Sequence, residues 1–169
     1  TKAEFNILDM TRAKAYLLAH PARSILHLAA ISDTRLAERD PVLSYKVNVR
    51  GTANMAELAT ACKTKIAYIS TDYVFSGTVG NYTEDALPSP SNWYGFTKYA
   101  GELEIQTRTD AYLIIRTAFR PRVWPFASAY FDVFTSADYV DIIAAEVLRA
   151  LALNLSGVIH IGTPKKTLY

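Results

Sequence analysis

A tyrosine and a lysine lie four positions apart in the segment YGFTK, as Tyr94 and Lys98. Residues with this spacing share one face of a helix, so the phenol and the ammonium group are expected close together. A phenol has a pKa near ~10, but a nearby ammonium favours the phenolate and lowers that pKa. The pair therefore predicts proton exchange with a carbonyl or alcohol oxygen, and the ammonium could also hold a ribose hydroxyl.

A second polar cluster, STDYVFSG at residues 70–77, follows an apolar run of strand length. Thr71 stands at the expected strand end, where its hydroxyl could donate a hydrogen bond to a developing alkoxide. A cofactor-dependent hydride transfer needs such groups, because the cofactor carries the hydride while the protein supplies a proton and positions the oxygen. Tyr94 and Lys98 alone are a weak signal, since a half-buried tyrosine beside an exposed lysine is common on helices. Their place after a proline-rich loop and a strand ending in Ser-Thr-Asp favours a reaction centre.

Apolar runs of strand length alternate with longer amphipathic stretches along the chain. The expected strands are residues 24–29, 65–70, 112–116 and 157–161, the first of them buried on both faces. The expected helices are residues 11–20, 41–62, 94–107 and 138–153, with Thr11, Asp40 and Ser136 as N-caps. This alternation predicts an α/β fold with a parallel sheet and helices on both of its faces.

A loop rich in glycine and proline, residues 76–92, interrupts this alternation between the second strand and the third helix. Ligands of open parallel sheets bind outside the carboxyl ends of the strands. The loop leaves such an end, so the expected site lies there.

The composition argues against several classes of partner and site. The chain has 169 residues, a formal net charge of +2 and no block of lysine or arginine, so no nucleic-acid partner is implied. The single cysteine, Cys62, excludes a disulfide within the chain and a cysteine-based metal site, and no metal site is expected. No apolar run reaches the ~20 residues of a membrane span, and the N-terminus has no signal-peptide pattern. We expect a cytoplasmic protein without a membrane partner.

Six segments, in order along the chain, resemble the extended short-chain dehydrogenase/reductase superfamily. They are HLAA (27–30), ERDP with NVRGTANMAELA (38–59), YISTDYVFSG (68–77), YTEDALPSPSNWYGFTKYAGE (82–102), IIRTAF (114–119) and GVIHIG (157–162). Within the superfamily the chain looks most like dTDP-4-dehydrorhamnose reductase and other sugar-nucleotide reductases. Epimerases tend to have a Ser-rich motif where this chain has Ser70 to Tyr73, and 4,6-dehydratases tend to have Asp-Glu where it has Asp72-Tyr73.

The resemblance implies a Rossmann-like doubly wound parallel sheet with flanking helices and the reduction of a 4-keto nucleotide sugar by NADPH or NADH. Carried over by position, it makes Tyr94 the catalytic acid, Lys98 its partner and a ribose ligand, and Thr71 the hydroxyl that polarises the oxygen. The implied cofactor-binding residues are Asp9, Met10, Ala29, Ala30, Ile31, Ser70, Tyr94 and Lys98. The implied substrate-binding residues are Thr71, Asp72 and Tyr73.

Several residues in these segments can also be explained by a purely structural role. Asp9 could simply cap the helix that follows it, and Ala29 with Ala30 could be small only for close packing. Asn48 is better explained as a buried polar group that bonds the backbone of a neighbouring strand. Glu84 is expected to order the loop.

Two histidines and a basic segment could each bind a ligand or have only a structural role. His27 and His160 lie in expected strands without a carboxylate or cysteine cluster, so satisfied core residues are favoured over ligands. Arg120, Arg122 and Trp124 could meet a nucleotide diphosphate or could form a solvated loop.

The chain departs from the superfamily pattern at two places. It has no Gly-rich strand-to-helix turn for a pyrophosphate, so we expect residues 1–169 to be an incomplete portion of a single NAD(P)-binding domain that lacks its first strand and helix. After Thr117 the chain leads directly to the last expected helix, so the substrate lobe is expected to be reduced.

These departures leave a second hypothesis open, a non-catalytic module resembling the regulatory beta subunit of methionine adenosyltransferase. A homodimer through the helices at 41–62 and 94–107 is also possible, although burial against the sheet explains their apolar faces equally well.

Overall fold

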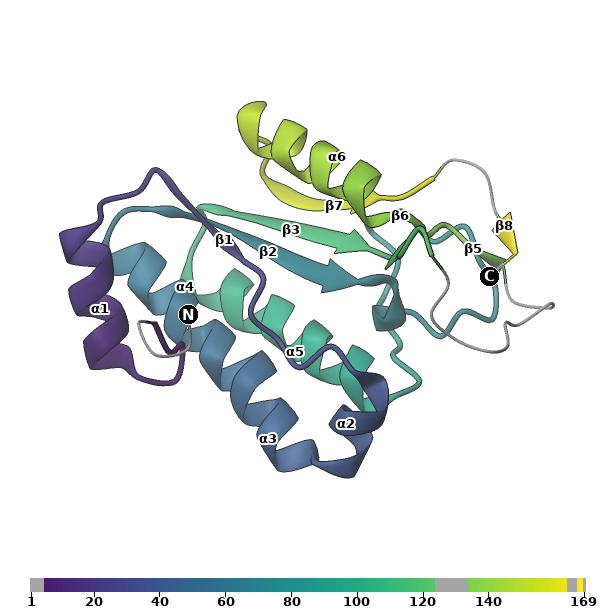
Figure 1. The fold of residues 1–169 in the computed structure, drawn as a ribbon, viewed down its shortest axis with the longest axis horizontal. Helices are drawn as coiled ribbons and strands as arrows, with labels where there is room; N and C mark the ends of the chain where they lie inside the picture. Colours follow the sequence, from purple (N-terminus) through teal and green to yellow (C-terminus); the bar gives the residue numbers. More distant parts are fainter. Residues whose placement is uncertain (1–4, 124–133, 164–166, 169) are drawn as a thin grey trace.

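The computed structural model describes residues 5–123, 134–163 and 167–168 (Figure 1). Four parallel strands form the central sheet in the order β1-β2-β3-β7. They are β1 (Ser24–His27), β2 (Lys65–Thr71), β3 (Tyr112–Thr117) and β7 (Gly157–Ile161). The predicted parallel α/β fold is therefore confirmed, with each predicted strand within two residues of its observed bounds.

The register of the strands brings their carboxyl ends to one edge of the sheet. Thr71, the last residue of β2, pairs with Thr117, the last residue of β3. Thr117 pairs in turn with Ile161 at the end of β7. Side chains on register-paired residues of parallel strands project on the same side of the sheet, so the two threonines are neighbours.

Helices cover both faces of the sheet, as predicted. Figure 1 shows α4 (Thr52–Ala61) and α5 (Trp93–Arg108) on one face and α6 (Val140–Ala152) on the other, with α1 (Met10–Ala19) at the side of α4. Ile66 and Tyr68 of β2 belong to the core beneath α4 and α5. Ala67 and Ile69, which alternate with them, pack in the core beneath α6. This alternation explains why the buried strands have nearly continuous apolar sequences.

The long helix predicted at residues 41–62 forms, but not as one regular α-helix. It consists of α3 (Pro41–Tyr45), a π-helical turn η1 (Lys46–Gly51) and α4. Asp40 caps its start as predicted, because the Asp40 carboxylate accepts a 2.9 Å hydrogen bond from the Leu43 backbone N–H. The π-helical turn was not predicted, since a single wide turn leaves the hydrophobic spacing almost unchanged.

Two predicted N-caps are wrong. Asp9, not Thr11, caps α1, and its carboxylate accepts a 3.0 Å hydrogen bond from the Arg12 backbone N–H. Ser136 does not cap α6, because the short strand β6 (Asp138–Tyr139) intervenes and Tyr139 occupies the cap position. The Ser136 carbonyl instead accepts a hydrogen bond from the Thr163 backbone N–H.

The prediction that the first strand is buried on both faces is also wrong. β1 has one sheet neighbour, and along it only His27 is buried. Leu28, just after the strand, is 65% exposed. An apolar sequence of this length cannot by itself distinguish a central strand from one at the edge of the described sheet.

Short elements complete the described chain. They are α2 (Thr34–Arg39), the 3-10 turn η2 (Asp72–Val74), and the two-residue strands β4 (Phe119–Arg120), β5 (Phe134–Thr135) and β8 (Thr167–Leu168). β4 pairs with β6, and β5 pairs with β8. Within the described ranges, every helix is too short or too polar to cross a bilayer.

Candidate active site

The site is built where β2 ends and α5 begins. Asn92 caps α5, accepting a 2.7 Å hydrogen bond from the Gly95 backbone N–H. A Cβ atom on Gly95 would lie 2.1 Å from the carbonyl oxygen of Tyr73, so only glycine allows α5 to start this close to η2. This close approach places Tyr94, the second residue of α5, beside Thr71, the last residue of β2.

The Thr71 hydroxyl lies near the Tyr94 phenol and lowers its pKa, in opposition to burial. The Thr71 hydroxyl also lies 3.2 Å from the Asp72 carboxylate and accepts a 3.2 Å hydrogen bond from the Tyr73 backbone N–H. The Tyr73 ring packs edge-on against the Tyr94 ring, with a centroid separation of 6.0 Å. The structure thus brings together four residues that the sequence assigned to the reaction centre.

The electrostatics of Tyr94 differ from the prediction. Burial raises the pKa of Tyr94 to about 12, the nearby Thr71 hydroxyl opposes this in part, and the Asp72 carboxylate and Tyr73 raise the pKa further. The expected lowering of this pKa by Lys98 is therefore wrong for this arrangement. Tyr94 remains a protonated phenol at neutral pH, which makes it a proton donor rather than a base.

Lys98 lies on the same face of α5 as Tyr94 but is directed at another ring. Its side chain is only 3% exposed, and its Nζ lies 3.9 Å from the centroid of the Tyr68 ring. Burial lowers the pKa of Lys98 to about 7, against the opposing effect of the Glu102 carboxylate. The charged and the neutral forms of Lys98 are thus both populated near neutral pH.

Ser70 belongs to a buried ionic network and does not face an open cleft. Its hydroxyl donates a hydrogen bond to the fully buried Glu102 carboxylate. The same carboxylate pairs with Arg116 of β3, whose Nη2 lies 2.8 Å from Oε2. Ser70 therefore has a structural partner, and its proposed contact with a cofactor stays a prediction.

Asn48 has the structural role that was favoured for it. Its amide oxygen accepts a 2.7 Å hydrogen bond from the Ile31 backbone N–H, and its amide nitrogen donates to the Ile31 carbonyl at 3.0 Å. The same nitrogen donates to the Thr97 hydroxyl, which donates in turn to the Tyr94 carbonyl at 2.8 Å. The π-helical turn thus fastens the segment that follows β1 to the first turns of α5.

The predicted cofactor-binding residues fall into two groups. Ala29, Ala30 and Ile31 follow β1 and are partly or fully exposed. Asp9 caps α1, as its structural alternative proposed, and Met10 packs against the core beneath α4. Both of these residues have structural roles, and their place beside an adenine stays a prediction.

Thr117 is a candidate site residue that was not among those predicted from the sequence. It is 5% exposed, and its hydroxyl has no hydrogen-bond partner among the described residues. It is the register partner of Thr71 at the same edge of the sheet. The signal was present in the sequence, because Thr117 follows the apolar run YLIIR as Thr71 follows KIAYIS.

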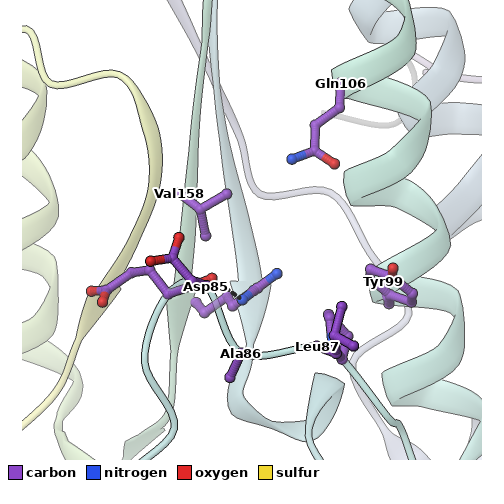
Figure 2. Close-up of a pocket in the computed structure, with 9 residues that line it drawn as sticks. Asp85, Ala86, Leu87, Tyr99, Gln106 and Val158 are labelled. Atoms are coloured by element: carbon purple, nitrogen blue, oxygen red, sulfur yellow. Dashed lines mark hydrogen bonds between the residues drawn. The ribbon is translucent and has the colours of Figure 1, made fainter.

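A separate cavity of about 330 Å³ lies between α5 and the sheet, lined in part by Tyr99, Gln106 and Val158 (Figure 2). Thr71, Tyr94 and Lys98 are not among its lining residues, so its size does not make it the reaction centre. The loop residue Glu84 closes one side of it. The Glu84 carboxylate accepts a 3.0 Å hydrogen bond from the His160 backbone N–H, so Glu84 orders the loop as predicted.

The two histidines differ. His27 is a satisfied core residue, as predicted, since its Nε2 lies 3.0 Å from the Thr52 hydroxyl. His160 is only half-buried, and its Nε2 has no hydrogen-bond partner within residues 5–123 and 134–163. The prediction of a satisfied core residue is therefore wrong for His160.

The basic segment after β3 is partly described. Arg122 pairs with Asp141 at the surface, with Nη2 2.6 Å from Oδ2, and both Arg120 and Arg122 lie over the Tyr139 ring. Trp124 lies outside the described residues. Arg122 thus behaves as part of a solvated surface in this structure.

Comparisons with known proteins identify the family. The sequence pattern of the RmlD substrate binding domain matches residues 1–128. The chain belongs to this family. The resemblance noted from the sequence is therefore confirmed.

Curated relatives of this RmlD-type chain include a methionine adenosyltransferase subunit and a reductase. Methionine adenosyltransferase 2 subunit beta of Xenopus laevis is 34% identical over 111 residues, which are 66% of this chain and 33% of that protein. A dTDP-4-dehydrorhamnose reductase of Streptomyces griseus is 32% identical over 120 residues, which are 70% of this chain and 40% of that protein. The RmlD-type chain thus spans only about a third to two-fifths of these relatives.

Solved structures agree with the Rossmann-like fold. The dTDP-4-dehydrorhamnose reductase of Bacillus anthracis, crystallised with NADP, superimposes with a TM-score of 0.91 at 26% identity. That comparison covers 99% of this chain and 65% of the reductase. The Bordetella bronchiseptica enzyme WbmG, crystallised with NAD and UDP, shares the fold with a TM-score of 0.80 at 17% identity.

Proposed function

We propose that this chain holds the reaction centre of an NADPH- or NADH-dependent reductase that acts on a 4-keto nucleotide sugar. The nearness of Thr71, at the end of β2, to Tyr94, at the start of α5, carries the proposal, because it brings two hydroxyl groups to the carboxyl edge of a parallel sheet. Membership of the RmlD family supports an oxidoreductase of sugar nucleotides in general terms. The particular substrate is part of the proposal.

The residues present fit a nicotinamide cofactor. Asn48 fixes the backbone at Ile31, and the small residues Ala29 and Ala30 precede it at the edge where a cofactor would lie. The buried Thr117 hydroxyl, without a partner among the described residues, offers a further hydrogen bond there. A reductase of known structure in this family carries NADP, which supports the same assignment. When bound, the cofactor would supply the hydride.

The chain's own residues supply the proton and orient the carbonyl. Tyr94 is protonated at neutral pH, since both the ordinary pKa of a phenol and its raised value of about 12 lie well above 7, and the phenol can deliver that proton to the oxygen as the carbonyl becomes an alcohol. Thr71 donates a hydrogen bond to the same oxygen and favours its developing negative charge. Lys98 would hold a ribose hydroxyl in its ammonium form. Asp72 and Tyr73 would border the sugar.

The test is oxidation of NADPH and of NADH by the full-length protein with a 4-keto dTDP-sugar. Tyr94→Phe removes the proton donor, and we expect it to lower kcat by about 10²- to 10⁴-fold. Lys98→Ala should also lose most of the rate. Tyr99→Phe is the matched control, since Tyr99 lies on the same helix and lines the separate cavity. Equal rates in the wild type, Tyr94→Phe and Lys98→Ala would refute the proposal.

A second candidate function is a regulatory or binding subunit without catalysis. It is favoured by the identity with methionine adenosyltransferase 2 subunit beta. Calorimetry with NADPH and NADH separates the two candidates. A full-length protein that binds neither cofactor would have no hydride source and would favour the subunit.

Assembly and location stay predictions. Val42 is 63% exposed on α3, and Phe96 and Leu103 are 42% and 43% exposed on α5. A homodimer through these helices would cover such side chains, and light scattering of the full-length protein would test it. A cytoplasmic location agrees with the cofactor and substrate proposed, and cell fractionation tests it.

A further inference from the structure

Lys98 is held by a single aromatic residue of the neighbouring strand. Tyr68 of β2 is fully buried, and its ring face lies 3.9 Å from the Lys98 Nζ. The Tyr68 hydroxyl also lies 3.4 Å from the backbone carbonyl oxygen of Lys98 and donates to it. One side chain thus contacts both the charged end and the backbone of the lysine.

Tyr68 is itself fixed from other sides. A Cβ atom on Gly101 would lie 2.5 Å from the Tyr68 hydroxyl oxygen, so a glycine at this position of α5 lets the phenol reach the helix backbone. The His27 ring stacks on the Tyr68 ring with a centroid separation of 5.5 Å. The His27 imidazole is held in turn by the Thr52 hydroxyl, which lies 3.0 Å from its Nε2 and donates to the Asn48 carbonyl at 2.7 Å. The ring therefore has little freedom to move away from Lys98.

An aromatic face is the kind of partner that a buried ammonium needs. Burial removes the water that normally solvates the charge, and the negative face of a ring replaces part of that stabilisation. The Glu102 carboxylate is one turn away on α5, but Arg116 and Ser70 already share its oxygens. The Tyr68 ring is the group whose contact with the Lys98 Nζ is direct.

We propose that Tyr68 is a positioning residue for the reaction centre, whose ring retains the Lys98 ammonium and whose hydroxyl fixes the Lys98 backbone. The role of Lys98 in catalysis rests on the proposed function above, whereas the contact between the two side chains does not. Tyr68 does not touch the reacting atoms and acts through Lys98 alone.

The other titratable groups near Lys98 do not obscure this contact. Glu102 acts on it from α5, His27 from β1 and Tyr68 from β2. Burial, and then the charge of Lys98, lower the pKa of His27 to about 3, so His27 is neutral across the useful pH range. Burial raises the pKa of Tyr68 well above its ordinary value, so replacing Tyr68 removes a ring but no charge.

The experiment measures the Lys98 pKa directly, by NMR titration of the full-length protein labelled at the lysine side chains. Lys98→Met identifies the Lys98 signal by its loss. Tyr68→Phe keeps the ring, and we expect the Lys98 pKa to stay near that of the wild type. Tyr68→Leu removes the ring, and we expect the pKa to fall by about one unit, since an aromatic face stabilises a desolvated cation by roughly that much. At neutral pH, Tyr68→Leu should also raise the KM for NADPH more than it lowers kcat.

A second substitution covers the case in which Tyr68→Leu does not fold. Pentafluorophenylalanine at position 68 keeps the ring shape but reverses the charge of its face, and we expect it to lower the Lys98 pKa relative to Tyr68→Phe. Tyr112→Leu is the control, because Tyr112 packs at the border of the same core on the neighbouring strand. It should leave the Lys98 pKa unchanged.

The outcomes separate this inference from the proposed function. An unchanged Lys98 pKa with either the leucine or the fluorinated ring overturns the inference, even if Tyr94→Phe abolishes reductase activity. A Lys98 pKa that falls when the ring at position 68 is removed or fluorinated supports the inference. The absence of reductase activity would then count against the proposed function alone.

Discussion

At the scale of single residues, burial shifts the pKa values of Tyr94 and Lys98 more than any neighbouring group does. The Tyr-x-x-x-Lys spacing correctly placed Tyr94 and Lys98 on one helix face. It did not predict their protonation, because spacing does not say which ring or charge each group meets in the folded chain. Tyr94 meets Thr71, whereas Lys98 meets Tyr68.

Thr117 offers a test of whether its buried hydroxyl serves a ligand. Thr117→Val keeps the shape and removes a hydroxyl that has no partner among the described residues. We expect stability to be unchanged or slightly higher, and the KM of the cofactor or the sugar to rise about tenfold, as when one hydrogen bond is lost. Urea unfolding and steady-state kinetics measure the two effects.

Thr97→Val is the contrasting variant, because the Thr97 hydroxyl bonds both Asn48 and the Tyr94 carbonyl. It should lower the free energy of unfolding by about 1–3 kcal/mol. A Thr117→Val protein with the same loss of stability and an unchanged KM would contradict the ligand role.

Lys98 offers a test in the pH dependence of stability. Its pKa is about 7 in the folded state, well below its ordinary value, so the unfolded chain binds more protons than the folded one between those two values. The cost of burying Lys98 is therefore absent above its unfolded pKa and grows as the pH falls toward 7. We expect Lys98→Met to stabilise the protein by about 1–3 kcal/mol at neutral pH and less at alkaline pH.

Thermal unfolding at several pH values measures this difference. A stability difference between Lys98→Met and the wild type that does not change with pH would contradict the lowered pKa. The same variant should be inactive, so the residue would be costly for stability and necessary for function.

At the scale of elements, a buried ion pair joins three parts of the chain. The carboxylate of Glu102, on α5, binds both Arg116 of β3 and Ser70 of β2. Arg116 also donates a 3.2 Å hydrogen bond to the Glu84 carbonyl and so reaches the loop. These residues lie in segments that carry the family resemblance, but their pairing could not be read from spacing, because it depends on the register of β2 against β3.

Glu102→Gln tests this pair. The substitution leaves Arg116 buried without a full opposite charge, and we expect the free energy of unfolding to fall by about 3–5 kcal/mol. Arg122→Ala breaks the ion pair with Asp141, whose side chains are both more than half exposed, and should change it by less than about 1 kcal/mol. Equal effects of the two variants in urea unfolding would contradict the importance of the buried pair.

Element boundaries show where sequence reasoning works and where it stops. Hydrophobic periodicity located β2, β3, β7 and α5 well, because their burial follows directly from apolar spacing. It missed the six-residue helix α2, which is too short to establish a period. It also mistook two N-caps, since several residues of the right type stand near each helix start.

At the scale of the whole molecule, the described chain is a parallel sheet with helices on both faces and with Thr71, Thr117 and Ile161 at one edge. The family and the parallel sheet were predictable because ordered motifs cover most of the chain. The exposure of β1 was not, since a strand's sequence does not state how many neighbours it has. The chain spans 65% of the Bacillus reductase.

The bond from the His160 backbone to Glu84 has a consequence for the order in which the site is made. A ribosome releases the chain from its N-terminal end, so Thr71, Tyr94 and Lys98 all emerge long before His160. Until then the loop that leads into α5 lacks the backbone N–H that holds its carboxylate. β7, the last strand of the described central sheet to be synthesised, therefore supplies this bond to the loop, and nascent chains that stop short of β7 carry Thr71, Tyr94 and Lys98 without it.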